Sequence, residues 1–214
     1  MIRIINFVFI IFFLLLVKAY SLIEIDITRG NLDPLPIAVS PLFQDDNSKK
    51  NSINELKIEN IGSEISSVVE NNLKTSGLFN PLSKEAFLQK PDIAHLKPRF
   101  EDWALIKAQA LITGKVTIEN KKLKVEFRLW DILAGREMMA LAFTTVPSNW
   151  RRVGHIISDK VYERLTGEKG YFDTRIIYVS EEGPKTARVK KLAIMDQDGF
   201  NTKYLTLGNE LVLT

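Results

Sequence analysis

Histidine and carboxylate side chains are the residues of this sequence that could bind a metal or transfer protons. The chain has no cysteine and only two histidines, His95 and His155, so a zinc site would depend mostly on carboxylates. Neither histidine has a partner at the spacing of a metal-binding motif. The Gly-x-Ser-x-Gly turn of serine hydrolases and a phosphate-binding glycine loop are both absent from the sequence. We therefore expect no metal or cofactor, and neither serine-hydrolase nor phosphate-loop chemistry.

Two carboxylate pairs remain as candidates. Glu24 and Asp26 share one face of an expected strand, as an acid–base pair would, but alternating acids on the outer face of a strand are usually solvated, and we favour solvation. Asp196 and Asp198 precede Gly199 and resemble the start of a calcium loop, yet such a loop needs several more oxygen ligands and a distant glutamate. A hairpin turn that uses Asp-Gly is the better interpretation.

The first 21 residues have the pattern of an export signal. Arg3 is followed by a 14-residue apolar run that Asn6 alone interrupts, and then by an Ala-x-Ser cleavage pattern ending at Ser21. Fourteen helical residues rise only about 21 Å, short of the roughly 30 Å hydrocarbon core of a membrane. We expect residues 1–21 to be a cleaved signal peptide that directs the protein to the periplasm. The alternative is an uncleaved anchor, because Lys18 lies close to the cleavage site.

Length, composition and charge narrow the class of protein. At 214 residues, with 45% hydrophobic and 26% charged residues, the chain fits one good-sized globular domain, or a medium domain plus a fragment. The absence of cysteine excludes a small disulfide scaffold. Removing the signal leaves 27 basic and 26 acidic residues, so there is no excess charge to favour a nucleic-acid partner.

Apolar and polar residues alternate directly after the signal, in the stretch "LIEIDIT" at residues 22–28. This two-residue period is typical of a half-buried strand. Arg29 and Gly30 end it, and prolines follow. A strand at the new N-terminus, before a glycine hinge, is either an edge strand or a detachable arm that pairs with a partner protein by strand addition or docks in a groove.

Strand and helix patterns follow in the first half of the chain. We expect a buried strand over residues 37–43, with Pro41 marking its end or an edge. A polar loop is expected over 44–55. Apolar residues at helical spacing then predict an amphipathic helix over 61–73, and Gly77 follows as its C-terminal stop.

Shorter elements are expected before residue 109. Residues 78–83, "LFNPLS", read as a short extended turn, and two prolines bracket a loop over 91–98. A short helix should begin near Glu101. Trp103 and Ile106 should face inward from it.

Three strand-like runs and a long helix complete this domain. The runs, between residues 109 and 146, predict a meander, and the alternation from Leu123 to Leu129 places one face of the middle strand in a core. The helix should begin at a cap at Ser148 and end before Gly167, with an apolar face formed by Trp150, Val153, Ile157, Val161 and Leu165. The fold class is thus α/β, with a two-layer amino-terminal domain over 22–167 in which two main helices cover a mixed sheet.

Three further extended runs follow a short joint. The joint is "GEKGYFD", and the runs are "TRIIYVSEE", "ARVKKLAIMDQDG" and "TKYLTLG". These runs resemble the first blade of the six-bladed propeller in the TolB family, the periplasmic component of the Tol-Pal system. Four earlier stretches resemble landmarks of the TolB amino-terminal domain in order and spacing: "NNLKTSGLFNPL", "AQALITGKV", "VEFRLWDILAGRE" and "RRVGHIISDKVYERLTGEKGYFDTRIIYVS".

The resemblance implies a partner site at the start of the mature chain. In the family this arm binds TolA, so the residues expected to carry the contact are Leu22, Ile23, Glu24, Ile25, Asp26, Ile27, Thr28, Arg29 and Gly30. The leading residue, Leu22, departs from the family pattern.

The resemblance also implies the overall function. It predicts a non-enzymatic scaffold that links inner-membrane TolA to the outer-membrane lipoprotein Pal, for outer-membrane integrity and invagination during division, without nucleic acid or a small-molecule substrate. Pal is bound mainly through the propeller, of which residues 172–214 supply one incomplete blade, and propellers have typically four to eight. We therefore expect the 214 residues to be a fragment or a truncated product. The alternative is a fragment of an exported propeller enzyme that acts on a sugar or peptide.

Overall fold

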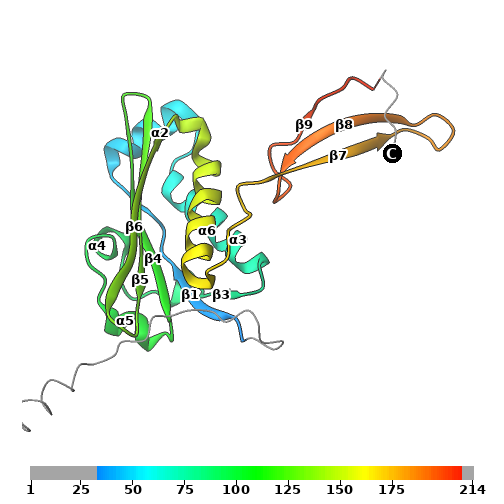
Figure 1. Cartoon of the computed structure of the whole chain (residues 1–214). Coiled ribbons are helices and arrows are strands. Elements are labelled where there is room, and N and C mark those ends of the chain that lie inside the picture. The colour runs from blue at the N-terminus through cyan, green and yellow to red at the C-terminus, as the bar shows by residue number, and fades with distance from the viewer. Residues whose placement is uncertain (1–32, 209–214) are drawn as a thin grey trace, which may run out of the picture.

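The computed structural model describes residues 33–208, which form an α/β unit followed by a three-stranded unit (Figure 1). In these residues no helix combines the length and the apolar character needed to cross a membrane. The expected strand over 22–28, the signal peptide and residues 209–214 lie outside the described part of the chain.

A mixed sheet forms the centre of the α/β unit, with strand order β3-β1-β4-β5-β6 and β2 paired with β4. The strands are β1 (Leu35–Val39), β2 (Phe43–Gln44), β3 (Phe79–Pro81), β4 (Ala110–Glu119), β5 (Lys122–Asp131) and β6 (Arg136–Thr145). β1 runs parallel to β3 and β4, and β2 runs parallel to β4. β4, β5 and β6 are antiparallel, which confirms the predicted meander and the mixed sheet.

The meander follows directly from local sequence. Asn120 and Lys121 both adopt positive φ, 50° and 58°, as a two-residue hairpin loop of the I′ kind requires. Their turn sets Glu119 opposite Lys122. In β5 the alternate residues Leu123, Val125, Phe127 and Leu129 are buried, as predicted.

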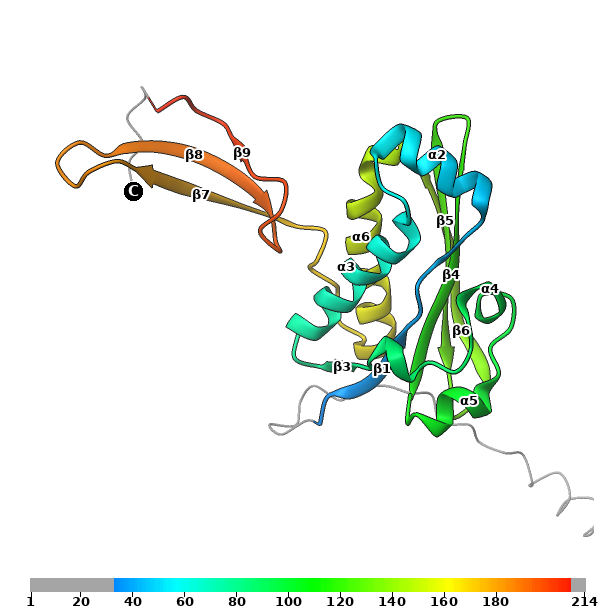
Figure 2. The same ribbon diagram turned by 180° about the vertical axis from the view of Figure 1, so that it is seen from behind.

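The two main helices, α3 (Ile61–Thr75) and α6 (Trp150–Thr166), pack side by side on one face of the sheet (Figures 1 and 2). Both were predicted from apolar spacing. Their close packing requires Gly154, because a Cβ there would lie 2.9 Å from Cγ1 of Val68. Gly167 ends α6 with φ 76°, a left-handed value that glycine adopts without strain.

Short helices cover part of the opposite face of the sheet. They are η1 (Lys84–Ala86), α4 (Pro91–Ala94) and α5 (Phe100–Leu105). Trp103 of α5 is 1% exposed and packs in a second, smaller core with Leu111 and Trp130 of the sheet. Ile106 is half-buried beside them. The inward orientation predicted for Trp103 is therefore confirmed.

The polar loop predicted over 44–55 is wrong, because helix α2 (Asp46–Leu56) lies there. The segment has no apolar stripe, so the usual helical signal is missing. Hydrogen bonds hold it instead: the amide N–H of Ile118 donates to Oγ of Ser48 at 3.2 Å, and Nδ2 of Asn51 donates to the carbonyl of Ile118 at 2.7 Å. Both bonds anchor α2 to the end of β4.

We expect Asp45→Ala to lower the free energy of unfolding by about 1 kcal/mol, because Oδ1 of Asp45 caps α2 by accepting the Ser48 N–H at 2.8 Å. The same donation lowers the pKa of Asp45, so the contribution is present at neutral pH and is lost as the carboxylate protonates in acid. Urea unfolding would measure it. Asp46→Ala is the control, and an equal loss in both variants would contradict the capping role.

Several element boundaries differ from prediction. The strand expected over 37–43 is divided into β1 and β2, because Pro41 cannot donate to a ladder. Residues 79–81 form strand β3, and the loop over 91–98 includes the one-turn helix α4. The cap of α6 is Asn149, the last residue of the 3₁₀ turn η2 (Pro147–Asn149), and Ser148 is not the cap. Trp150 is only half-buried.

The three-stranded unit is antiparallel, with strands β7 (Arg175–Glu182), β8 (Val189–Asp196) and β9 (Lys203–Tyr204). The turn between β8 and β9 carries Gly199 at φ 85°, so the hairpin turn predicted for Asp-Gly is confirmed. Large apolar side chains on this unit are exposed, among them Ile177, Tyr204, Leu205 and Leu207.

Candidate functional site

The predicted partner site, residues 22–30, lies outside the described residues, so its placement stays a prediction. The structure does describe where that segment joins the fold. Asp33 and Pro34 are exposed, and the chain becomes buried at Leu35, the first residue of β1. Residues 33 and 34 therefore lie at the surface of the domain.

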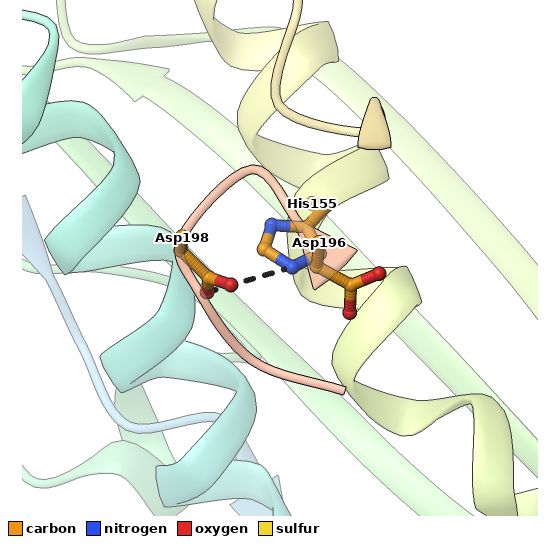
Figure 3. A group of neighbouring side chains, drawn as sticks. All are labelled: His155, Asp196 and Asp198. Atoms are coloured by element: carbon orange, nitrogen blue, oxygen red, sulfur yellow. Dashed lines mark ion pairs between the residues drawn. The ribbon is translucent and has the colours of Figure 1, made fainter. Parts of the chain in front are cut away.

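A second site lies where the β8–β9 turn meets the two main helices (Figure 3). Asp198, at the tip of the turn, has a side chain only 5% exposed and forms an ion pair with Arg151 of α6. The guanidinium of Arg151 also lies 3.6 Å from the ring centroid of Phe200, a cation–π contact that covers the pair. Removing one partner of such a buried pair strongly destabilises the folded protein, because the other charge stays buried without a counter-ion.

Asn72 of α3 connects the turn to α6. Its Nδ2 donates to Oγ of Ser158 at 3.0 Å and lies 2.9 Å from Nδ1 of His155, while its Oδ1 accepts from Nε2 of Gln197 at 3.0 Å. Asn72, His155 and Ser158 are fully buried. One amide thus joins residues from three segments far apart in the sequence.

The tautomer of His155 follows from these bonds. Because Nδ2 of Asn72 is a donor, Nδ1 of His155 accepts and the ring proton lies on Nε2. Nε2 faces Oδ2 of Asp198 at 3.6 Å, beyond hydrogen-bond distance. Burial is the main cause that lowers the pKa of His155; Asp198 raises it and Arg151 lowers it further. His155 is therefore neutral at pH 7.

His155, Asp196 and Asp198 place three potential ligand atoms within 4.8 Å of one another. The arrangement does not fit a metal ion, however. The carboxylate of Asp198 is already paired with the guanidinium of Arg151. In the tautomer of His155 given above, Nε2 directs a proton, and not a lone pair, at the carboxylates.

The same residues do not form a nucleophile–base pair. The hydroxyl of Ser158 donates to the carbonyl of Gly154 at 2.9 Å and accepts from Asn72, so its proton is not directed at His155. The arrangement required for covalent catalysis, a hydroxyl bonded to an imidazole base, is not formed here. The network instead suits a structural role, in which buried polar groups fix the contact between two units.

The joint between the units is held by two carboxylates. Asp159 of α6 accepts the amide N–H groups of Phe172 at 2.6 Å and Asp173 at 3.2 Å. Asp173 receives two parallel bonds from Arg152, at 3.0 Å each, which raise the pKa of that arginine. Beside this joint, Arg152, Arg175 and Lys203 line a cavity of about 290 Å³ between the two units.

We expect Gly170→Ala to destabilise the joint by about 1–3 kcal/mol, because overpacking forces backbone shifts. A Cβ at Gly170 would lie 2.4 Å from Cα of Asp159. Urea unfolding of the variant should have a lower midpoint. Lys169→Ala, an exposed neighbour, is the control and should leave the midpoint unchanged, whereas an unchanged midpoint in Gly170→Ala would contradict the packing argument.

Sequence reasoning missed this network. It considered His155 only as a metal candidate, and Asp198 only as a calcium-loop or turn residue. The signal could not be found locally, since Asn72 and Gln197 are 125 residues apart. The sequence predicted the hairpin turn that carries Asp198. It could not predict that this turn docks on α3 and α6, because that contact forms only in the folded chain.

Comparison with known proteins agrees with this architecture. Residues 23–138 match the TolB amino-terminal domain family. The chain is 78% identical over 209 residues to the Tol-Pal system protein TolB of Pelagibacter ubique, covering 98% of this chain and 47% of that protein.

A solved structure shares the fold across both units. The crystal structure of TolB from Acinetobacter baumannii matches with a TM-score of 0.66 and 23% identity, over 86% of this chain and 41% of that one. The present chain thus spans less than half the length of either protein. The family match and the 78% identity show that the chain belongs to the TolB family of the Tol-Pal system.

Proposed function

We propose that the protein is a non-enzymatic periplasmic scaffold of the Tol-Pal system. Its amino-terminal arm, residues 22–30, binds a TolA-type inner-membrane protein, and the propeller of the complete protein binds the Pal lipoprotein. The link supports outer-membrane integrity and invagination during division. The 78% identity to a Tol-Pal system protein is the observation that carries this proposal.

The arm proposal is supported by how the chain enters the fold. Exposed Asp33 and Pro34 precede the buried β1, and Pro34 has no N–H with which to continue a ladder. A segment attached in this way can leave the domain without disturbing β1 or its neighbours. Its alternating side chains then give a partner one apolar face to recognise.

The propeller proposal is supported by the surface of the three-stranded unit. Ile177, Tyr204, Leu205 and Leu207 are between 52% and 81% exposed, whereas adjacent blades of a propeller cover such faces. We infer that this unit is the first blade. The chain covers 47% of its Pelagibacter relative, and we infer that further blades lie in the part of that relative which this chain does not cover.

Two calorimetric titrations would test the function. One mixes the chain from Leu22 onward with the periplasmic part of a TolA-type protein, and the other mixes it with Pal that lacks its lipid. We expect binding in the first and strongly reduced binding in the second, compared with a relative that has a complete propeller. An absence of TolA-type binding would overturn the proposed role of the arm.

A further inference from the structure

The buried network at the β8–β9 turn has one state of protonation that suits the bonds of the Asn72 amide, while Nε2 of His155 has no hydrogen-bond partner in it. The Asn72 amide cannot be turned over freely, since Nδ2 donates to Ser158 while Oδ1 accepts from Gln197. Its orientation requires Nδ1 of His155 to be an acceptor, 2.9 Å away. Neutral His155 meets this requirement and imidazolium does not.

A second proton on His155 would place two donors against each other. Rotating the Asn72 amide would relieve that conflict, but it would remove the acceptor of Gln197 and the donor to Ser158. A buried polar group left without a partner is costly. The bond that would be lost is the one between α3 and the turn.

The charges around His155 oppose one another. Asp198, Asp196 and Asp173 favour the imidazolium, whereas Arg151 and burial disfavour it, and burial is the largest influence on the pKa. Asp198 does not act freely as a counter-ion, because its Oδ2 already holds Arg151. The docked arrangement therefore prefers the neutral ring.

We propose that Asn72, His155, Gln197 and Asp198 form a proton-sensitive latch, which holds the β8–β9 turn on α3 and α6 while His155 is neutral and releases it when His155 is protonated. Docking is complete above the ordinary pKa of histidine, about 6.5. It weakens as the pH falls below that value, because the released state binds the proton more tightly. The latch would control how the blade is held against the amino-terminal unit. It requires no partner and goes beyond the proposed scaffold function.

The absence of cysteine allows a direct test. Lys74 at the end of α3 and Lys185 in the β7–β8 turn are exposed, so Lys74→Cys and Lys185→Cys together take two spin labels and no others. The distance between the labels is measured by pulsed electron paramagnetic resonance at about pH 7.5 and about pH 5. We expect one narrow distance population at the higher pH. At the lower pH about half or more of the molecules should enter a broader population.

The two histidines provide matched controls. His155→Asn keeps an acceptor near the position of Nδ1 but cannot gain the proton, so its distance distribution should stay narrow at both pH values. His95→Asn should respond like the parent. An unchanged parent distribution, or the parent response in His155→Asn, would overturn the latch.

A second measurement covers the case in which the β8–β9 turn of His155→Asn does not dock on α3 and α6. The ring of His155 is titrated by NMR in the parent, where His95 is the only other histidine signal. The midpoint of its titration should coincide with the midpoint of the distance change. A separation of more than about one pH unit between the two midpoints would contradict the proposal.

Discussion

Deletion of Leu22–Gly30 should abolish binding of a TolA-type partner, with a loss of at least about 100-fold, or 2.7 kcal/mol, while the α/β unit stays folded. Strand addition gains its affinity from main-chain hydrogen bonds and its specificity from alternate side chains. Removing the segment removes both. The fold should survive, because the described structure from Leu35 onward already pairs β1 with β3 and β4. Calorimetry measures the binding, and circular dichroism checks the fold.

Point variants test the geometry of the arm. Ile25→Asp places a charge in the proposed isoleucine face and should weaken association by roughly 1–3 kcal/mol, as an unpaired buried polar group does. Asp26→Asn lies on the opposite face of the same alternation and should have little effect. Unchanged affinity in the deleted protein would exclude this arm as the contact, and equal effects of the two point variants would contradict strand-like recognition.

The sequence predicted those parts of the fold that have a local repeating signal. The period of two in β5 places Leu123 to Leu129 in the core, and the helical spacing in α3 and α6 corresponds to their buried stripes. In each case one face of an element is apolar over several turns or residues. The period of the element places these apolar residues on a single face, and that face is the buried one.

The parts that could not be predicted depend on long-range bonds. Helix α2 is polar except for Ile53 and Leu56, too few to form an apolar stripe, and it is held mainly by a cap and by hydrogen bonds to Ile118, 67 and 70 residues away. The pairing of β3 with β1 uses only three residues, too few to show a period. No local pattern distinguishes such segments from a loop.

The two candidate sites differ in the same respect. The arm could be proposed from sequence because its alternation lies within seven consecutive residues. The turn network could not, because Asn72, His155 and Asp198 come from α3, α6 and the β8–β9 turn. Only the packing of α3 on α6 brings the first two side chains together. The role of these network residues in connecting the two units therefore could not be predicted from the sequence alone.

The second large effect is expected at the smaller core on the opposite face of the sheet. Trp103→Ala should lower the free energy of unfolding by about 3–5 kcal/mol, the usual range for a buried tryptophan. Its side chain is 1% exposed and its ring centroid lies 5.0 Å from that of Phe87. Its Nε1 donates to Oε1 of Gln89 at 3.1 Å. Truncation would open a cavity between α5 and the sheet and remove this bond.

Urea unfolding followed by tryptophan fluorescence suits the Trp103→Ala prediction, because Trp103, Trp130 and Trp150 all lie in the α/β unit. The signal in the variant still comes from two tryptophans of that unit.

Trp150→Ala is the matched control: Trp150 is half-buried at the start of α6, so its loss removes less apolar area from the core and should lower the free energy of unfolding by less than half as much. Gln89 Oε1 also accepts the Arg99 N–H at 2.9 Å, so it keeps a partner in Trp103→Ala, and the expected loss comes mainly from the cavity. Equal destabilisation by the two variants would show that Trp103 contributes no more to the stability of the fold than half-buried Trp150 does.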